Sequence, residues 1–236
     1  MFKSFTKTWH TQSYPEILPS RAELSAAGKV VFITGGGSGI GKATAIAFAE
    51  AGAKVVAIFG RRVVNLQLAA EEISKANPAR TTTVITESVD ITQRQAVEAA
   101  FANASKKSGG AKVDILVSNA GSLKPRNPLT TYGEKEWRES IEENLIGSFN
   151  VVQTVAPLLA PKAKILNVSS GIAHINPLQG YWAYSSLKLA IVKMFDFLQA
   201  ENPDLSVFNI QPGVVDTELN QVSMFPAQDE GKLTAL

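Results

Sequence analysis

Short apolar runs rich in β-branched residues recur along the chain and alternate with longer amphipathic stretches. Such near-continuous apolar runs are typical of strands buried on both faces of a parallel sheet. Strand–helix alternation implies right-handed crossovers, so we expect an α/β, single-domain, doubly wound parallel sheet with helices on both faces. The pattern predicts strands over residues 29–34, 54–59, 82–87, 113–118, 163–169 and 205–210, and helices over 40–51, 63–76, 92–107, 134–159 and 182–200.

Three segments divide the chain. We expect residues 1–28 to form an N-terminal extension that wraps or caps the domain, residues 29–220 to form the folded domain, and residues 221–236 to form a short polar tail. No internal repeat and no low-complexity segment interrupts this order.

Composition narrows the class of protein. The chain has 236 residues, 45% of them hydrophobic, which fits one domain with a sizeable core. Lys+Arg 23 against Asp+Glu 21 gives a net charge of +2, which does not support nucleic-acid binding. The absence of cysteine excludes a disulfide framework and thiolate metal sites, and the two histidines, His10 and His174, lie far apart, so we expect no metal.

No apolar run reaches the roughly 18–20 residues that a membrane helix needs. Residues 1–20 contain no continuous apolar segment and do not resemble a secretory signal. We therefore expect a cytoplasmic protein without a membrane partner.

A glycine-rich turn, Thr34-Gly35-Gly36-Gly37-Ser38-Gly39-Ile40-Gly41, follows the first predicted strand and opens the first predicted helix. Backbone amides and the helix dipole at such a position make a place for pyrophosphate. The spacing is G-x-x-x-G-x-G rather than the common G-x-G-x-x-G, and a turn that serves packing alone is the alternative. Given the flanking strand and helix, we expect a Rossmann-type dinucleotide site that includes Gly35, Gly37, Ser38, Gly39, Ile40 and Gly41.

The second predicted strand ends in Phe59-Gly60-Arg61-Arg62 and carries no acid. An acid at this point often holds the adenosine ribose and would repel a 2′-phosphate, whereas two guanidinium groups attract one. We therefore expect NADP (NADPH) as the cofactor, bound through Arg61 or Arg62, with NAD the less favoured choice. A solvated arginine pair that opens a helix is the alternative.

Asp90 follows the third predicted strand. It could accept a hydrogen bond from the adenine amino group, or it could be an N-cap for the helix that begins near Thr92. The sequence favours neither role.

Tyr184 and Lys188 lie four residues apart on a predicted helix and therefore share a face. An ammonium beside a phenol favours the phenolate, which makes a proton donor and acceptor that works near neutral pH. An ordinary amphipathic pair is the alternative. Together with a nucleotide-binding turn, the pair suggests hydride transfer to or from a carbonyl.

Taken in order, these motifs resemble the classical short-chain dehydrogenase/reductase family, with fungal members in particular. The resemblance covers roughly residues 29–220. It rests on the glycine turn, Asn119-Ala120-Gly121, Asn144, Ser169-Ser170, Tyr184-(x3)-Lys188 and Pro212-Gly213-(x3)-Thr217.

The resemblance implies a role for each motif. Ser170 would hold the substrate oxygen, Tyr184 would exchange the proton, and Asn144 would help to hold a water in the proton relay. Lys188 would bind the nicotinamide ribose and lower the pKa of Tyr184. The remaining cofactor contacts would come from Asn119, Ala120 and Gly121 and from Pro212, Gly213, Val215 and Thr217.

Two departures from the family pattern stand out. Ser170 lies one residue farther from Tyr184 than is common, and the last edge strand of the family's sheet is not evident after Thr217. The resemblance implies an NADP(H)-dependent oxidoreductase of the carbonyl reductase type that acts on a ketone or secondary alcohol as a homodimer or homotetramer. The alternative is a cofactor-binding regulatory or inactive family member with a truncated C-terminus.

Overall fold

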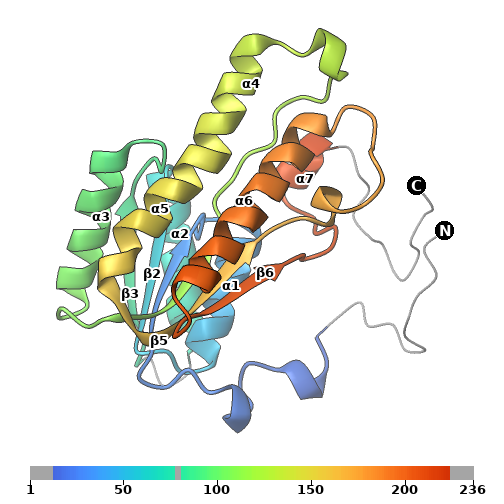
Figure 1. Ribbon diagram of the computed structural model, residues 1–236. Coiled ribbons are helices and arrows are strands. Elements are labelled where there is room, and N and C mark those ends of the chain that lie inside the picture. The colour runs from blue at the N-terminus through green and yellow to red at the C-terminus, as the bar shows by residue number, and fades with distance from the viewer. Residues whose placement is uncertain (1–12, 78–80, 224–236) are drawn as a thin grey trace.

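The computed structural model describes residues 13–77 and 81–223. Six strands form one parallel sheet in the order β3-β2-β1-β4-β5-β6 (Figure 1). The predicted doubly wound α/β architecture is confirmed. The strands are β1 (Val30–Thr34), β2 (Val55–Gly60), β3 (Thr83–Ser88), β4 (Val113–Ser118), β5 (Leu159–Val168) and β6 (Ser206–Ile210).

Helices cover both faces of the sheet, as the alternating pattern predicts (Figure 1). One core cluster packs α1 and α2 against the sheet, and a second packs α3, α5 and α6 against the opposite face. In the second cluster, the rings of Phe59 and Phe101 lie 4.3 Å apart between centroids. The helices are α1 (Gly39–Glu50), α2 (Val63–Ala76), α3 (Arg94–Lys107), α4 (Glu134–Ser140), α5 (Gly147–Val155), α6 (Trp182–Glu201) and α7 (Glu218–Ser223).

The helix expected over residues 134–159 is not continuous. A π-helical turn over Ile141–Ile146 separates α4 from α5, and a 3-10 turn over Ala156–Leu158 ends the run. The fifth strand begins at Leu159 rather than at 163, and Lys162 there has a φ of 61°. A shift in register between β4 and β5 accommodates this irregular start.

The N-terminal segment joins the domain just before β1, where the Ala26 amide donates to the Ala51 carbonyl. It forms 3-10 turns over Pro15–Ile17 and Ala22–Leu24, and Ala27 then pairs antiparallel with Ala53. Most of the expected tail lies at 224–236, outside the described residues, so the proposed division into three segments stays a prediction.

Strand β1 pairs with β2 on one side and with β4 on the other, so the direction of winding reverses at β1. In open α/β sheets, ligands bind beyond the carboxyl ends of the strands at this switch point. The glycine turn and Asn119 both follow strands that end here, which places the expected cofactor cleft at this edge.

Candidate active site

The glycine turn lies directly after β1 and is held by neighbouring backbone. The amides of Gly35 and Gly36 donate to the carbonyl of Phe59 at the end of β2. A Cβ at Gly41 would overlap the Gly35 carbonyl oxygen and would lie 2.6 Å from Asn119 Nδ2. A side chain at Gly36 would lie 2.6 Å from Ile58. The turn therefore requires glycine at these points, and the binding of a dinucleotide pyrophosphate by its amides stays a prediction.

Asn119 ties the end of β4 to this turn. Its Nδ2 donates to the Thr34 carbonyl at 3.0 Å, and the Thr34 hydroxyl accepts from the amides of Asn119 and Ala120 at 3.0 and 3.1 Å. These bonds fix the segment Asn119-Ala120-Gly121 beside the glycine turn, where the resemblance expects it to line the cofactor cleft.

Arg62 lies beside the glycine turn. Its Nη2 donates to Ser38 Oγ at 3.3 Å and pairs with Glu218 Oε2 at 2.7 Å. Arg61, the other candidate for a 2′-phosphate contact, precedes it at the end of β2. The arginines therefore lie at the expected end of the strand, and one of them contacts a residue of the predicted phosphate site.

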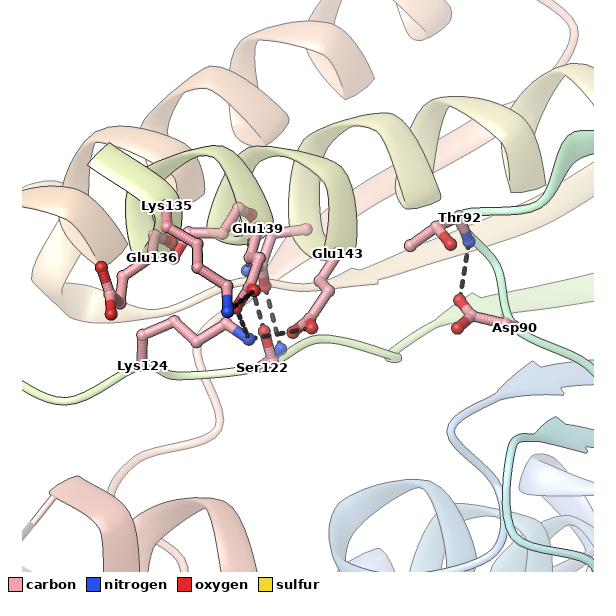
Figure 2. Close-up of polar contacts among 10 residues, drawn as sticks. Asp90, Thr92, Ser122, Lys124, Lys135, Glu136, Glu139 and Glu143 are labelled. Atoms are coloured by element: carbon pink, nitrogen blue, oxygen red, sulfur yellow. Dashed lines mark hydrogen bonds and ion pairs between the residues drawn. The ribbon is translucent and has the colours of Figure 1, made fainter. Parts of the chain in front are cut away.

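Asp90 has a local partner. Its Oδ1 accepts from the Thr92 amide at 3.0 Å in the turn before α3 (Figure 2). This hydrogen bond supports the alternative in which Asp90 holds the turn before α3, although the N-cap residue of α3 is Gln93. A contact with adenine stays a prediction.

Tyr184 and Asn144 line one small cavity, together with Ser122, Ser140 and Leu187. Tyr184 comes from the first turn of α6 and Asn144 from the π-helical turn. The Asn144 side chain is fixed at both ends: Oδ1 accepts from the Ser122 amide at 3.0 Å, and Nδ2 donates to the Ser140 carbonyl at 3.0 Å. Two of the four predicted catalytic residues therefore line this cavity, and a water contact of Asn144 stays a prediction.

Lys188 lies on the buried stripe of α6, with only 7% of its surface exposed. Its Nζ donates to the Val168 carbonyl at 2.9 Å and lies 5.6 Å from the centroid of the Tyr184 ring. A Cβ at Gly121 would lie 3.9 Å from Nζ and 3.0 Å from Asn144 Oδ1. The amine, the Asn144 amide and Gly121 therefore converge at one point.

The chain alone shows no lowering of the Tyr184 pKa by Lys188, so that effect stays a prediction for the cofactor-bound protein. Burial, aided by the neighbouring Tyr181, raises the pKa of Tyr184 to about 12. Burial also lowers the pKa of Lys188 from 10.5 to about 8. Both pKa shifts disfavour the charged form, because removal from water penalises the phenolate and the ammonium alike.

Ser170 begins the 3-10 turn Gly171–Ala173, and its Oγ accepts from the Ile172 amide at 3.4 Å. The hydroxyl of Ser185, the residue after Tyr184, donates to the Ile172 carbonyl at 2.8 Å and fixes this turn to α6. The neighbouring Ser169 hydroxyl is buried and has no hydrogen-bond partner. The choice of Ser170 as the substrate contact stays a prediction.

The segment after β6 returns to the glycine turn. Gly213 has a φ of 80°, and Thr217 Oγ1 accepts from the Asn220 amide at 3.1 Å at the start of α7. A Cβ at Gly39 would lie 3.0 Å from Thr217 Cγ2. Thr217 thus lies against the glycine turn, as the resemblance expects, whereas the nicotinamide contacts expected from Pro212, Gly213 and Val215 stay predictions.

An ion cluster that the sequence reading missed borders the Tyr184 cavity. Lys124 pairs with Glu143 at 2.9 Å and with Glu139 at 3.0 Å (Figure 2). Burial alone would raise the pKa of Glu143, but hydrogen bonds from Ser122 and Lys124 lower it. The spacing of four between Glu139 and Glu143 places them on one helix face, and this spacing can be seen in the sequence. Their pairing with Lys124, in the loop after β4, depends on the tertiary fold.

Neither a metal site nor a membrane-spanning helix is found within residues 13–77 and 81–223. No group of three or more histidine, cysteine, aspartate or glutamate side chains there could hold a metal ion. No helix of these segments is both long and apolar enough to cross a bilayer.

Comparison with known proteins decides the family. A family model described as short chain dehydrogenase matches residues 29–225. The chain belongs to the short-chain dehydrogenase family. A short chain dehydrogenase, mpl6 of Monascus purpureus, is 34% identical over 98% of this chain and 78% of its own length. The relative pigC of Monascus ruber is 33% identical over 91% of this chain and 71% of its own length.

Solved structures agree with this family. A short chain dehydrogenase from Burkholderia cenocepacia in complex with NADP has a TM-score of 0.74 and 26% identity, and the match covers 83% of this chain and 78% of that one. An alcohol dehydrogenase from Thermococcus sibiricus complexed with 5-hydroxy-NADP has a TM-score of 0.73 and 30% identity over 81% of this chain and 79% of that one. The short-chain dehydrogenase described here is thus an oxidoreductase of a family that uses NAD(P).

Proposed function

We propose that this short-chain dehydrogenase is an NADP(H)-dependent carbonyl reductase, in which Tyr184 donates a proton to a ketone or accepts one from a secondary alcohol. One observation carries the proposal. Tyr184 and Asn144 line the same cavity, and Lys188 lies one turn further along α6, where it converges with Gly121 beside the cofactor edge of the sheet. This arrangement supports a proton donor beside the expected dinucleotide site.

The chain's residues divide the proton chemistry between them. A carbonyl that accepts hydride becomes alkoxide-like, so it needs one donor to hold the oxygen and a second to protonate it. We assign the first role to Ser170 and the second to Tyr184. When bound, the cofactor supplies the hydride and, in its oxidised form, a positive charge. Lys188 would hold its ribose and, once charged there, favour the Tyr184 phenolate.

The choice of NADP over NAD rests on Arg61 and Arg62. A guanidinium can bind a 2′-phosphate through two hydrogen bonds, and Arg62 already contacts Ser38 of the glycine turn. The two solved relatives named above were found with NADP or a derivative of it, which supports the same choice.

A second function, cofactor binding without turnover, is favoured by one observation. The cavity beside Tyr184 has a volume of only about 10 Å³, which is room for a single water. Movement of the loop after β4 or of the loop before α6 would make more room for a ketone at the phenol. A regulatory member of the family would not need that movement.

Assembly and location belong to the same proposal. Exposed apolar side chains on α5 and α6, namely Phe149, Leu189 and Phe197, support a homodimer or homotetramer. Phe195 of α6 is fully buried in the core and contributes nothing to this exposed face. A cytoplasmic location rests on the sequence features alone.

A ketone panel with NADPH and NADH tests the function and the cofactor choice together. We expect oxidation of NADPH with at least one ketone. We also expect Arg62→Gln to weaken NADPH binding by about tenfold and to leave NADH binding unchanged. The reason is that a well-formed hydrogen bond to a charged group contributes about 1.5–3 kcal/mol. Binding of NADPH without turnover across the panel would favour the regulatory function. Equal loss of both cofactors in Arg62→Gln would overturn the assignment to NADP.

A further inference from the structure

Arg62 is not free to meet a phosphate in this structure, because a carboxylate of the same chain already holds it. Glu218 Oε2 lies 2.7 Å from Arg62 Nη2, and both side chains are more than half exposed. The same nitrogen donates to Ser38 Oγ at 3.3 Å. The guanidinium thus bridges the glycine turn and the first residue of α7.

This contact joins segments 156 residues apart in sequence. Thr217, the neighbour of Glu218, lies against Gly39 of the glycine turn and caps the first turn of α7 through its hydroxyl. Two adjacent residues therefore anchor the start of α7 over the turn where we place the cofactor phosphates.

A carboxylate and a phosphate are alternative anionic partners for one guanidinium. The hydrogen bond and the charge of Arg62 lower the pKa of Glu218, so this contact favours the ionised carboxylate. An ionised carboxylate at this position either leaves when a 2′-phosphate arrives or repels it.

We propose that Glu218 is a specificity-determining residue that competes with the 2′-phosphate of NADP(H) for Arg62, so that binding of this cofactor breaks the Arg62–Glu218 pair and releases the start of α7. The proposal rests on the NADP(H) assignment above. NADH lacks the 2′-phosphate, so it leaves the pair intact. Glu218 therefore moderates the preference for NADP(H) and couples cofactor identity to the segment after β6.

Substitution of Glu218 by glutamine tests the competition directly. We expect Glu218→Gln to tighten NADPH binding by about two- to fivefold, as measured by calorimetry, since an exposed ion pair of this kind is weak. We expect the same gain for 2′,5′-ADP, which carries the phosphate without the nicotinamide, and no change for NADH. The gain should shrink at high salt because salt screens exposed charges.

A matched variant controls for the lost charge. Glu98 is another exposed carboxylate paired with an arginine, Arg94, at 2.6 Å, but it lies on α3 away from the glycine turn. Glu98→Gln should leave the affinities for NADPH, NADH and 2′,5′-ADP unchanged.

The outcomes distinguish the competition proposal from the NADP(H) assignment on which it rests. If Arg62→Gln weakens NADPH selectively while Glu218→Gln changes nothing or weakens NADPH, the competition proposal fails and the NADP(H) assignment stands. If Arg62→Gln leaves the ratio of NADPH to NADH affinity unchanged, both fail. Limited proteolysis gives an independent readout: cleavage near α7 should increase with saturating 2′,5′-ADP and not with 5′-ADP, and equal cleavage would contradict the release.

Discussion

Tyr184→Phe is expected to lower kcat by about 10²–10⁴-fold while NADPH affinity stays within about twofold of the wild type. The reason is chemical, because the phenol oxygen is the group that exchanges the proton, and positioned proton transfer contributes a factor of this size. The ring itself remains to fill the Tyr184 cavity, so the fold should not change. Steady-state turnover with the best ketone of the panel and cofactor titration by fluorescence measure the two quantities.

Tyr181→Phe is the matched control for this variant. Tyr181 is a second buried phenol, 3% exposed, at the N-cap of the same helix. Its loss should cost far less activity than the loss of the Tyr184 hydroxyl. Comparable losses in the two variants, or full activity in Tyr184→Phe, would contradict the role given to Tyr184.

Lys188→Met is expected to abolish most turnover and, at neutral pH, to make the protein more stable. Burial lowers the pKa of Lys188 from 10.5 to about 8, so holding the ammonium inside the fold at neutral pH costs about 3 kcal/mol. Loss of the hydrogen bond to the Val168 carbonyl offsets about 1 kcal/mol of that. We expect a net gain of about 2 kcal/mol in the free energy of unfolding and a Tm rise of about 4–8 °C.

The pH dependence of this gain identifies its cause. Between about pH 8 and 10.5 the unfolded chain holds the Lys188 proton and the folded chain does not, so wild-type stability rises with pH across this range. The gap between the variant and the wild type should therefore close as the pH approaches 10.5. Lys193→Met, which removes an exposed lysine of the same helix, should show no such dependence. A variant less stable than the wild type at neutral pH would contradict the account.

The loss of turnover and the gain in stability expected for Lys188→Met have one functional explanation. A buried lysine that destabilises the fold is the kind of cost that proteins carry at active sites. Lys188 satisfies its charge only partly through the Val168 carbonyl, and a cofactor ribose would add the missing partners. The pKa of Lys188, lowered by burial, thus fits a role in binding the cofactor ribose.

The sequence predicted much of the fold because periodicity reports burial directly. All six strands were found near their expected positions, and Lys188 and Tyr184 lie on one helix as the spacing predicted. The π-helical turn was not predicted. Asn144 lies in this turn, where its side chain donates to the Ser140 carbonyl and accepts from the Ser122 amide, and neither bond has a sequence signature.

The contacts at the site that the sequence did not predict likewise form only in the tertiary fold. Whether Lys188 changes the pKa of Tyr184 depends on burial and on a distance across the helix, and sequence spacing gives neither. The pairing of Lys124 with Glu143 and of Arg62 with Glu218 joins segments that only the tertiary fold brings together. The residue types give a hypothesis for the chemistry, whereas the contact partners of each side chain could be identified only from the structure.

Ultraviolet difference titration of the Tyr184 phenol tests the central claim most directly. The spectrum of Tyr184→Phe is subtracted from that of the wild type, first for the chain alone and then with saturating NADP⁺. We expect ionisation at about 12 for the chain alone and a clearly lower pKa with NADP⁺, because the positive ring and a charged Lys188 stabilise the phenolate. An unchanged pKa at saturation would contradict the assignment of Tyr184 as the proton donor and acceptor.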